Sequence, residues 1–250
     1  MTTGTATDPE ITRAFIAGPL ASAVRVLAVT ARPGQESADL GGLLYAFRRS
    51  GVSLSLLCLT RGEGPTQSSG TARLEAARTR EVQMAASILG VRQVAVAGYR
   101  DGILHHYRTS DLAGRIRRAV SEYSAGFVLV VAPEAGDIGD RAVAHAATAA
   151  ALLAGVPVAA RTTPGVPGAW TLRLGADAEV ARSIQKSAAA AHTSQSEALP
   201  MLIKRLDQLG SVETIRWLVS PGRVPAQRVG HEHPPPPSGQ PPSAGMPDGR

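Results

Sequence analysis

Short, almost uninterrupted apolar runs alternate with amphipathic stretches along most of this chain, and this alternation limits the folds open to it. The apolar runs are rich in β-branched residues: Val24–Thr30, Val52–Thr60, Gln93–Ala97 and Phe127–Ala132. Between them lie stretches with helical spacing: Leu40–Ser50, Thr71–Gly90, Ser110–Ser124 and Arg141–Gly155. Runs that are apolar on both faces predict strands of a parallel sheet. Right-handed crossovers would then build an α/β, Rossmann-like fold, a mostly parallel sheet with helices on both faces.

These runs predict one domain that spans residues 21–220. The elements expected in its last part are a strand at Trp170–Leu174, a long helix at Ala176–Leu199 and a short element at Val212–Val219. Residues 1–20 are expected to form a flexible N-terminus. Residues 221–250 are rich in Pro, Ser and Gly and offer too little apolar surface to order themselves, so we expect a disordered Pro-rich tail.

Composition and charge exclude several classes of protein. No apolar run approaches the roughly 20 residues that cross a bilayer, so we do not expect this chain to be a membrane protein. The net charge of +6 comes mainly from arginines that are scattered along the chain, and aromatic residues are few. Both observations argue against nucleic-acid binding. The lone Cys58 cannot form an intramolecular disulfide. The first residues lack the basic start and apolar stretch of a secretory signal, so we expect a cytoplasmic protein.

Short motifs follow the expected strands and helices in a fixed order. They are Ala31-Arg32-Pro33-Gly34-Gln35-Glu36 with Leu40-Gly41-Gly42, Thr60-Arg61-Gly62-Glu63, Arg78 with Glu81, Tyr99-Arg100-Asp101-Gly102, and Lys186 with His192, Ser194 and Gln195. Together they resemble the PIG-L/LmbE N-deacetylase family. The corresponding family motifs include Ala-His-Pro-Asp-Asp-Glu, Thr-x-Gly-Glu, Arg-x-x-Glu and Lys-x-x-Ala-x-x-x-His-x-Ser-Gln. The resemblance extends over about residues 24–196.

This resemblance implies a hydrolase that removes acetyl groups from N-acetylglucosamine conjugates, or cleaves related amides, with a zinc ion. In the family, the His and the second Asp of the first motif hold the zinc together with a His after the fourth strand. The first Asp of that motif is the general base. Three protein ligands leave a zinc position open for the attacking water, and a carboxylate takes the proton of that water. The identity of these four residues therefore decides whether the chemistry can run.

All four positions are replaced in this sequence. Arg32 stands at the first ligand position, Gly34 at the general base and Gln35 at the second ligand position. After the fourth strand, Asp137 and Asp140 stand where the family has histidines. Because arginine offers donors only, Asp140 is the one former ligand position that could still bind a metal. We therefore predict that this chain binds no metal and no other cofactor, although the family uses zinc.

The replacements lead to a hypothesis about the remaining site. Arg32 substitutes for the charge of the metal and pairs with Asp140, and also with Glu36. If the site still catalyses hydrolysis, Glu36 or Asp140 would act as the base on water, with Arg32 stabilising the oxyanion. The candidate catalytic residues are therefore Glu36, Arg32 and Asp140.

Two other residues are candidates for substrate binding. Arg78 lies one helical turn before Glu81, so the two could form an ion pair, or Arg78 could face the substrate. Asp101 lies in a Gly-containing loop, where its carboxylate could contact sugar hydroxyls or fix the turn. His192 belongs to a motif that is intact beside the replaced zinc ligands, which suggests either a packing role or a role in supporting the residues of the former metal site.

The sequence is compatible with three functions. The first is a homologue that lacks metal-dependent deacetylase activity and binds a sugar-like small molecule or a partner in the former catalytic cleft. The second is an N-deacetylase or amidase that acts on an N-acyl, sugar-like small molecule through a non-standard site. The third is a scaffold that recruits partners through the Pro-rich tail. Loss of the general base and two ligands favours the first.

Overall fold

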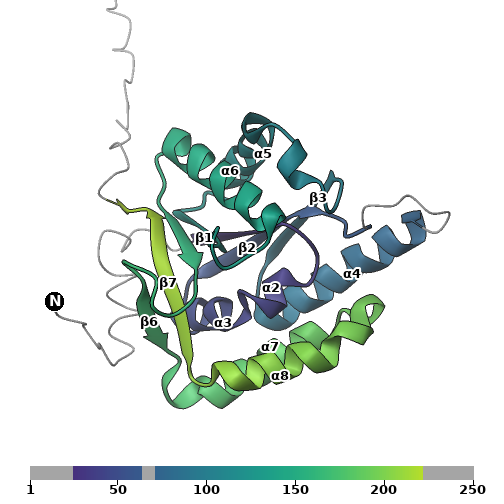
Figure 1. Ribbon diagram of the computed structural model, residues 1–250, viewed down its shortest axis with the longest axis vertical. Helices are drawn as coiled ribbons and strands as arrows, with labels where there is room; N and C mark the ends of the chain where they lie inside the picture. The colour runs from purple at the N-terminus through teal and green to yellow at the C-terminus, as the bar shows by residue number, and fades with distance from the viewer. Residues whose placement is uncertain (1–24, 64–70, 222–250) are drawn as a thin grey trace, which may run out of the picture.

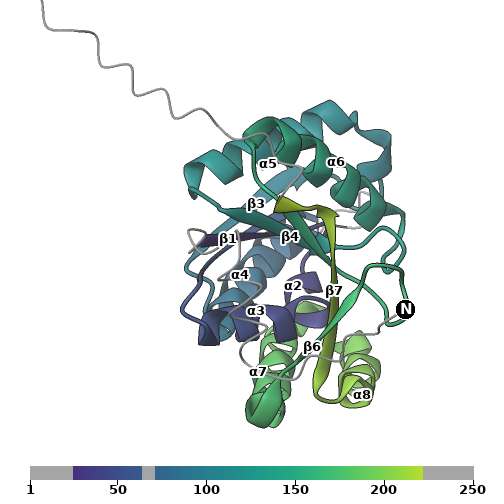
Figure 2. The same ribbon diagram turned by 90° about the vertical axis from the view of Figure 1, so that its left-hand side faces the viewer.

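Parallel strands form the centre of the fold (Figure 1). The computed structural model describes residues 25–63 and 71–221. The strands are β1 (Arg25–Thr30), β2 (Ser53–Thr60), β3 (Gln93–Tyr99), β4 (Phe127–Val131), β5 (Val158–Arg161), β6 (Trp170–Arg173) and β7 (Val212–Val219). They lie in the order β3-β2-β1-β4-β5-β7-β6. The first five pair in parallel, and β7 runs antiparallel to both β5 and β6. Figure 2 shows β6 and β7 at one end of the sheet.

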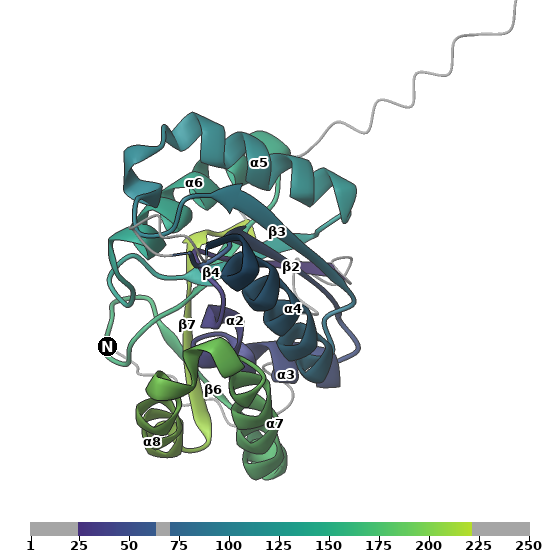
Figure 3. The same ribbon diagram turned by 90° about the vertical axis from the view of Figure 1, so that its right-hand side faces the viewer.

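Helices cover both faces of this sheet. They are α2 (Gln35–Ala38), α3 (Gly41–Arg49), α4 (Thr71–Leu89), α5 (Thr109–Glu122), α6 (Ile138–Ala154), α7 (Ala178–Ala190) and α8 (Leu199–Leu209). In the part of the chain that the structure describes, the connections also contain three short 3-10 helices: η1 (Leu104–His106), η2 (Gly175–Asp177) and η3 (Thr193–Ala198). Figure 3 shows α5 and α6 on one face and α3, α4 and α7 on the other, with α8 beside α7. The predicted α/β fold is therefore confirmed.

Each face of the sheet has its own hydrophobic core. Successive side chains of a strand point to opposite faces. In β1, Leu27 and Val29 pack in the core under α5 and α6, whereas Val26 and Ala28 pack in the core under α3 and α4. Burial on both faces explains why this strand has a continuous apolar sequence instead of an alternating one.

The C-terminal third differs from the sequence prediction. The strand β5 was not predicted, because its four residues form a run too short to stand out. The long helix predicted at Ala176–Leu199 is wrong, since α7 ends at Ala190 and the backbone leaves helical geometry at His192 and Gln195. A separate helix, α8, begins after this break with a proline in its first turn.

Some predictions fall on residues that the structure does not describe. The expected flexible segment 1–20 and the expected tail 221–250, apart from Pro221, lie outside the described ranges. The scaffold hypothesis depends on that tail. Within the described ranges, none of the helices has the length and apolar character needed to cross a bilayer.

The order of the strands predicts where a ligand crevice should lie. The chain leaves β1 toward β2 and β3 on one side, then returns to β4 on the other side of β1. At such a switch point, the loops after the two central strands separate and leave a crevice at the carboxyl ends of the strands. Here those loops are residues 31–34 after β1 and residues 132–137 after β4. The first motif and the Asp137–Asp140 segment therefore meet at this crevice.

A buried ion pair fixes α7 to β7. Arg182 donates from Nη1 to Glu213 Oε1 at 2.5 Å and from Nη2 to the carbonyl oxygen of Val212 at 2.8 Å. Both charged side chains are almost fully buried. The pair lies against α3, because a Cβ added at Gly42 would come within 2.1 Å of Glu213 Oε1. Glycine at this place in the motif therefore lets the buried pair approach α3.

We expect Glu213→Ala to lower the free energy of unfolding by about 3–5 kcal/mol, because it leaves the buried Arg182 guanidinium without its counter-ion. Urea denaturation measures this loss. Asp207→Ala is the matched control, since Asp207 pairs with Lys186 at the surface and should contribute about 0–1 kcal/mol. Equal losses in the two variants would contradict a special role for the buried pair.

Candidate functional site

Arg32 follows β1 and forms an ion pair across the crevice. Its Nη1 donates to Asp137 Oδ2 at 2.5 Å, and both side chains are about half-exposed. Asp137 is the N-cap of α6, where its Oδ1 accepts from the backbone N–H groups of Gly139 and Asp140. One carboxylate therefore both caps a helix and holds the guanidinium. The prediction that Arg32 pairs with Asp140 and Glu36 is wrong, because Asp137 presents its free oxygen at the surface.

Gln35 joins the same two loops beneath this ion pair. Its Oε1 accepts from the backbone N–H groups of Ala31 (2.9 Å) and Arg32 (3.3 Å), and its Nε2 donates to Asp140 Oδ1 at 2.7 Å. Asp140 Oδ2 accepts from the backbone N–H of Asp137 at 2.9 Å and completes a capping box. Both side chains are buried. The oxygens of Gln35 and Asp140 are thus already engaged by protein donors.

The electrostatics of these groups follow from burial and proximity. Although burial acts in the opposite direction, the neighbouring carboxylates of Asp137, Asp140 and Asp101 raise the pKa of Arg32. Burial likewise opposes the lowered pKa of Asp137, which results from the backbone N–H of Asp140 and from Arg32. Burial raises the pKa of Asp140, despite its hydrogen bonds from Gln35 and Asp137. Asp140 therefore takes up a proton more readily than an ordinary aspartate does.

Glu36 is fully buried and faces away from this ion pair. Its Oε1 lies 2.5 Å from His192 Nε2 and accepts from Ser37 Oγ, while its Oε2 accepts from the backbone N–H of Gly34. Because a carboxylate only accepts, Nε2 of His192 carries the proton in this contact. The second ring nitrogen, Nδ1, is buried and has no partner within the described ranges. The packing role predicted for His192 is therefore to anchor the first motif.

The C-terminal motif also holds α4. Glu81 accepts from Thr193 Oγ1, Ser194 Oγ and the backbone N–H of Ser194 at 2.7–2.8 Å. Although burial opposes the shift, these hydrogen bonds lower the pKa of Glu81. Arg78 donates from Nε to Ser194 Oγ at 3.3 Å, so the Arg78–Glu81 ion pair, one of the two alternatives considered from the sequence, does not form. Both α4 residues instead contact the turn after His192.

Asp101 lies in the loop after β3. Its Oδ1 accepts from the backbone N–H of Gly102 at 2.9 Å, which is the turn-fixing contact considered from the sequence. Its own backbone N–H donates to Glu63 Oε1 at 3.0 Å and so joins the loops after β2 and β3. The carboxylate also contributes to the potential at Arg32. Asp101 therefore lies at the crevice, and Arg78 lies beside it as well, because a Cβ added at Gly62 would come within 3.1 Å of both Arg78 Nη1 and Pro33 Cδ. A substrate-binding role of Asp101 and Arg78 stays a prediction.

The residues of the crevice do not fit the zinc ion that the family resemblance implies. Zinc is held by thiolate, imidazole or carboxylate groups, whereas Arg32 offers only donors. Gln35 directs its amide nitrogen at Asp140, and both Asp140 oxygens accept hydrogen bonds from the protein. Within residues 25–63 and 71–221, no three His, Cys, Asp or Glu side chains form a group that could hold a metal ion.

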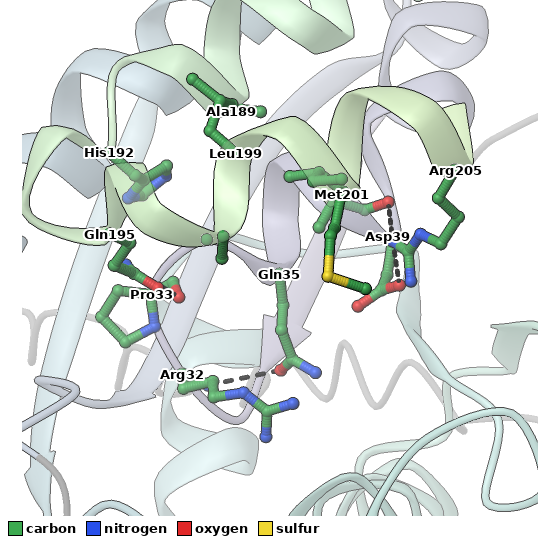
Figure 4. Close-up of a pocket in the computed structure, with 14 residues that line it drawn as sticks. Arg32, Pro33, Gln35, Asp39, Ala189, His192, Gln195, Leu199, Met201 and Arg205 are labelled. Atoms are coloured by element: carbon green, nitrogen blue, oxygen red, sulfur yellow. Dashed lines mark hydrogen bonds and ion pairs between the residues drawn. The ribbon is translucent and has the colours of Figure 1, made fainter. Parts of the chain in front are cut away.

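A cavity of about 410 Å³ lies between the first motif and the C-terminal helices (Figure 4). Residues of α2, α7, η3 and α8 line it. The polar or charged lining residues are Arg32, Gln35, Asp39, His192, Gln195 and Arg205. Arg205 could not be recognised as a lining residue from the sequence, because only the unpredicted helix α8 brings it to this place. The role of Asp137 was also missed, although an acid at the start of a helix is a common N-cap.

Glu134 braces the loop that carries Asp137. Its two oxygens accept from Arg216 Nε and Nη2 at 2.8 and 2.7 Å, and Oε1 also accepts from Thr162 Oγ1 at 2.6 Å. The hydrogen bonds from Arg216 lower the pKa of Glu134 to about 2, although burial opposes the shift. This bidentate contact fixes the loop after β4 to the last part of the sheet.

Sequence comparison identifies related proteins. The PIG-L family model, described as GlcNAc-PI de-N-acetylase, matches residues 27–155, which is just over half of the chain. A probable N-acetyl-alpha-D-glucosaminyl L-malate deacetylase 2 of Bacillus anthracis is 29% identical over 206 residues. The match covers 77% of this chain and 91% of that protein. The family resemblance predicted from the motifs is therefore confirmed.

Solved structures share the fold at lower identity. The 4-carboxy-2-hydroxymuconate hydratase GalB of Pseudomonas putida has a TM-score of 0.63 at 17% identity, and the match covers 78% of this chain and 96% of that one. The N,N'-diacetylchitobiose deacetylase of Pyrococcus horikoshii has a TM-score of 0.60 at 16% identity, with 88% and 96% covered. At these identities the likeness shows the fold alone.

We expect His192→Ala to lower the free energy of unfolding by about 2–4 kcal/mol, because the buried Glu36 carboxylate loses a charge-assisted hydrogen bond. Chemical denaturation measures the loss. The control is His145→Ala on the exposed side of α6, which should change the stability by no more than about 0.5 kcal/mol. A His192→Ala variant as stable as this control would refute the anchoring role.

The Glu134 contact predicts a pH dependence of stability. Because the pKa of Glu134 is depressed from 4.5 to about 2 in the folded state, its contribution is present above about pH 4.5 and is lost as the pH falls toward 2. Glu134→Gln should therefore lower the urea midpoint at neutral pH, and the difference from wild type should vanish near pH 2. Glu122→Gln, at an exposed helix position, is the control and should leave the acid limb unchanged.

Proposed function

The chain belongs to the PIG-L family, and we propose that it is a member that binds a small, sugar-like ligand without metal-dependent deacetylase activity. The observation that carries this proposal is the direct protein linkage at the family's zinc position. Arg32 is bonded to Asp137 and Gln35 to Asp140, so donors and acceptors of the former metal site satisfy one another. A divalent cation would meet a guanidinium at one ligand position and an amide nitrogen beside another.

The position of the general base supports the same proposal. Gly34 has no side chain to accept a proton, and its φ of 95° lies in the left-handed region that favours glycine. Glu36, the nearest carboxylate of the first motif, is buried and engaged by His192, Ser37 and Gly34. We therefore assign Glu36 a structural role instead of the catalytic role considered from the sequence.

The proposed ligand class rests on the crevice and on the named relatives. Asp101, Asp137 and Arg32 place hydrogen-bonding groups at the carboxyl end of the sheet, where an α/β fold of this order binds its ligand. The curated relative is named as a deacetylase of a glucosaminyl malate, and one structural neighbour as a deacetylase of diacetylchitobiose. Both names describe small sugar derivatives, which is the class we propose for this chain.

A second candidate function is metal-independent catalysis at the same crevice. The observation in its favour is the raised pKa of Asp140, which results first from burial and makes this group a candidate proton donor or acceptor. Arg32 lies close enough to stabilise developing negative charge. The structural neighbour that is named as a hydratase suggests that this fold supports more than one reaction.

Metal analysis tests the proposal. The native chain, purified without chelators, should contain no stoichiometric zinc, because its ligand positions are occupied by Arg32, Gln35 and the engaged Asp140. The triple variant R32H/Q35D/D140H restores the three family ligands and should bind close to one zinc per chain. Adding G34D to this variant restores the base, but the left-handed backbone at this position should make the fourfold variant less stable than the triple variant.

Two outcomes would overturn the proposal. Stoichiometric zinc in the native chain, together with metal-dependent release of acetate from N-acetylglucosaminyl malate, would make the chain an active deacetylase. Acetate release that persists with a chelator and disappears in D140N would favour metal-independent catalysis instead. Thermal unfolding of each variant establishes that lost activity or binding does not result from unfolding.

A further inference from the structure

The cavity between α2 and the C-terminal helices adjoins the former zinc position. Arg32, Gly34 and Gln35, which stand at the family's ligand and base positions, line it, whereas Asp101, Asp137 and Asp140 do not. Its remaining walls come from α7, η3 and α8, which lie outside the crevice (Figure 4). Its volume of about 410 Å³ lies within the roughly 300–1,000 Å³ of typical small-molecule sites.

One wall of the cavity is apolar. It is formed by Ala38, Ala189, Ala198, Leu199, Met201 and Leu202. Met201 is 81% exposed at the cavity, although methionine is usually buried. Methionine adapts its flexible thioether to irregular apolar partners and is common at binding surfaces. An apolar wall with an exposed methionine suits the hydrocarbon part of a ligand better than a sugar ring.

The charged residues that line the cavity are Arg32, Arg205 and Asp39. Arg32 is paired with Asp137 and Arg205 with Asp39, so an anion is favoured by the donors that remain on Arg205 and not by an excess of positive charge. The negative group is already satisfied, because Asp39 Oδ1 accepts from Arg205 Nη2 at 2.9 Å. The same nitrogen donates to the carbonyl oxygen of Ala38 at 2.7 Å. A cationic ligand would therefore have to break an existing ion pair.

Arg205 is held in place yet retains donors for a ligand. Both of its hydrogen bonds use Nη2, and neither Nε nor Nη1 has a partner among the residues that the structure describes. A guanidinium with free donors binds a carboxylate through charge-assisted hydrogen bonds. Met201, Leu202 and Arg205 all belong to α8 and line the same cavity, so one helix supplies both apolar groups and the guanidinium (Figure 4).

We propose that this cavity is a second ligand site, which binds a small amphipathic carboxylic acid. The carboxylate contacts Arg205, and the hydrocarbon chain packs against Leu199, Met201 and Leu202. Neither Arg205 nor α8 takes part in the network at the former zinc position. The proposed site shares Arg32, Gly34 and Gln35 with the former zinc position. Its test uses Arg205 and Leu202, which the function proposed for the crevice does not involve, so either proposal can fail alone.

Isothermal titration calorimetry of the full chain with three eight-carbon probes tests the site. Octanoate should bind at one site per chain, and 1-octanol should bind about tenfold or more weaker, because it lacks the charge that meets Arg205. Octylamine should not bind. R205Q should reduce the affinity for octanoate to that for 1-octanol, whereas L202A should weaken both of these ligands.

R49Q is the matched control for the loss of a surface arginine. Arg49 forms an exposed ion pair with Asp177 and does not line the cavity, so octanoate should bind R49Q as it binds wild type. Thermal unfolding shows whether R205Q and L202A are folded. The proposal is overturned if octanoate does not bind wild type, if 1-octanol binds equally well, or if R205Q retains the wild-type affinity. An equal loss in R49Q would indicate a general charge effect and would also overturn it.

Discussion

The buried contact between Glu36 and His192 connects parts of the chain that are far apart in sequence, and the geometry of the site depends on it. Glu36 is fully buried, so its carboxylate requires partners within the protein. His192, Ser37 and the backbone of Gly34 provide them. The hydrogen bond between Glu36 and His192 fixes α2 against the turn between α7 and η3. The orientation of α2 in turn places Gln35 toward the crevice and Asp39 toward the cavity.

A metal held by residues of two loops would tie the end of β1 to the start of α6, and hydrogen bonds make that connection here. Arg32 reaches the surface oxygen of Asp137, while Gln35 reaches the buried oxygen of Asp140. The Arg32–Asp137 pair is half-exposed, so its charges avoid most of the desolvation cost. The Gln35–Asp140 contact is buried, and there the donor is a neutral amide.

The sequence predicted the parts of the fold that repeat a strong pattern. The continuous apolar runs of β1, β2 and β4 allow hardly any other interpretation, but β5 has four residues and carries little periodic information. The break after α7 depends on the contacts of His192 and Ser194 with Glu36 and Glu81, which are distant in sequence. The choice of Asp137 over Asp140 as the partner of Arg32 was also inaccessible, because both acids lie in the same helical turn and only their burial differs.

The replacements at the former zinc position make sense as a set. An aspartate at position 35 would place a second carboxylate beside Asp140, and without a cation between them the two negative charges would repel. Glutamine removes that repulsion. Its Oε1 accepts from the backbone N–H groups of Ala31 and Arg32, and its Nε2 supplies the donor that Asp140 needs. Once Arg32 excludes the metal, glutamine at position 35 is the change that leaves Asp140 satisfied, so the two substitutions depend on each other physically.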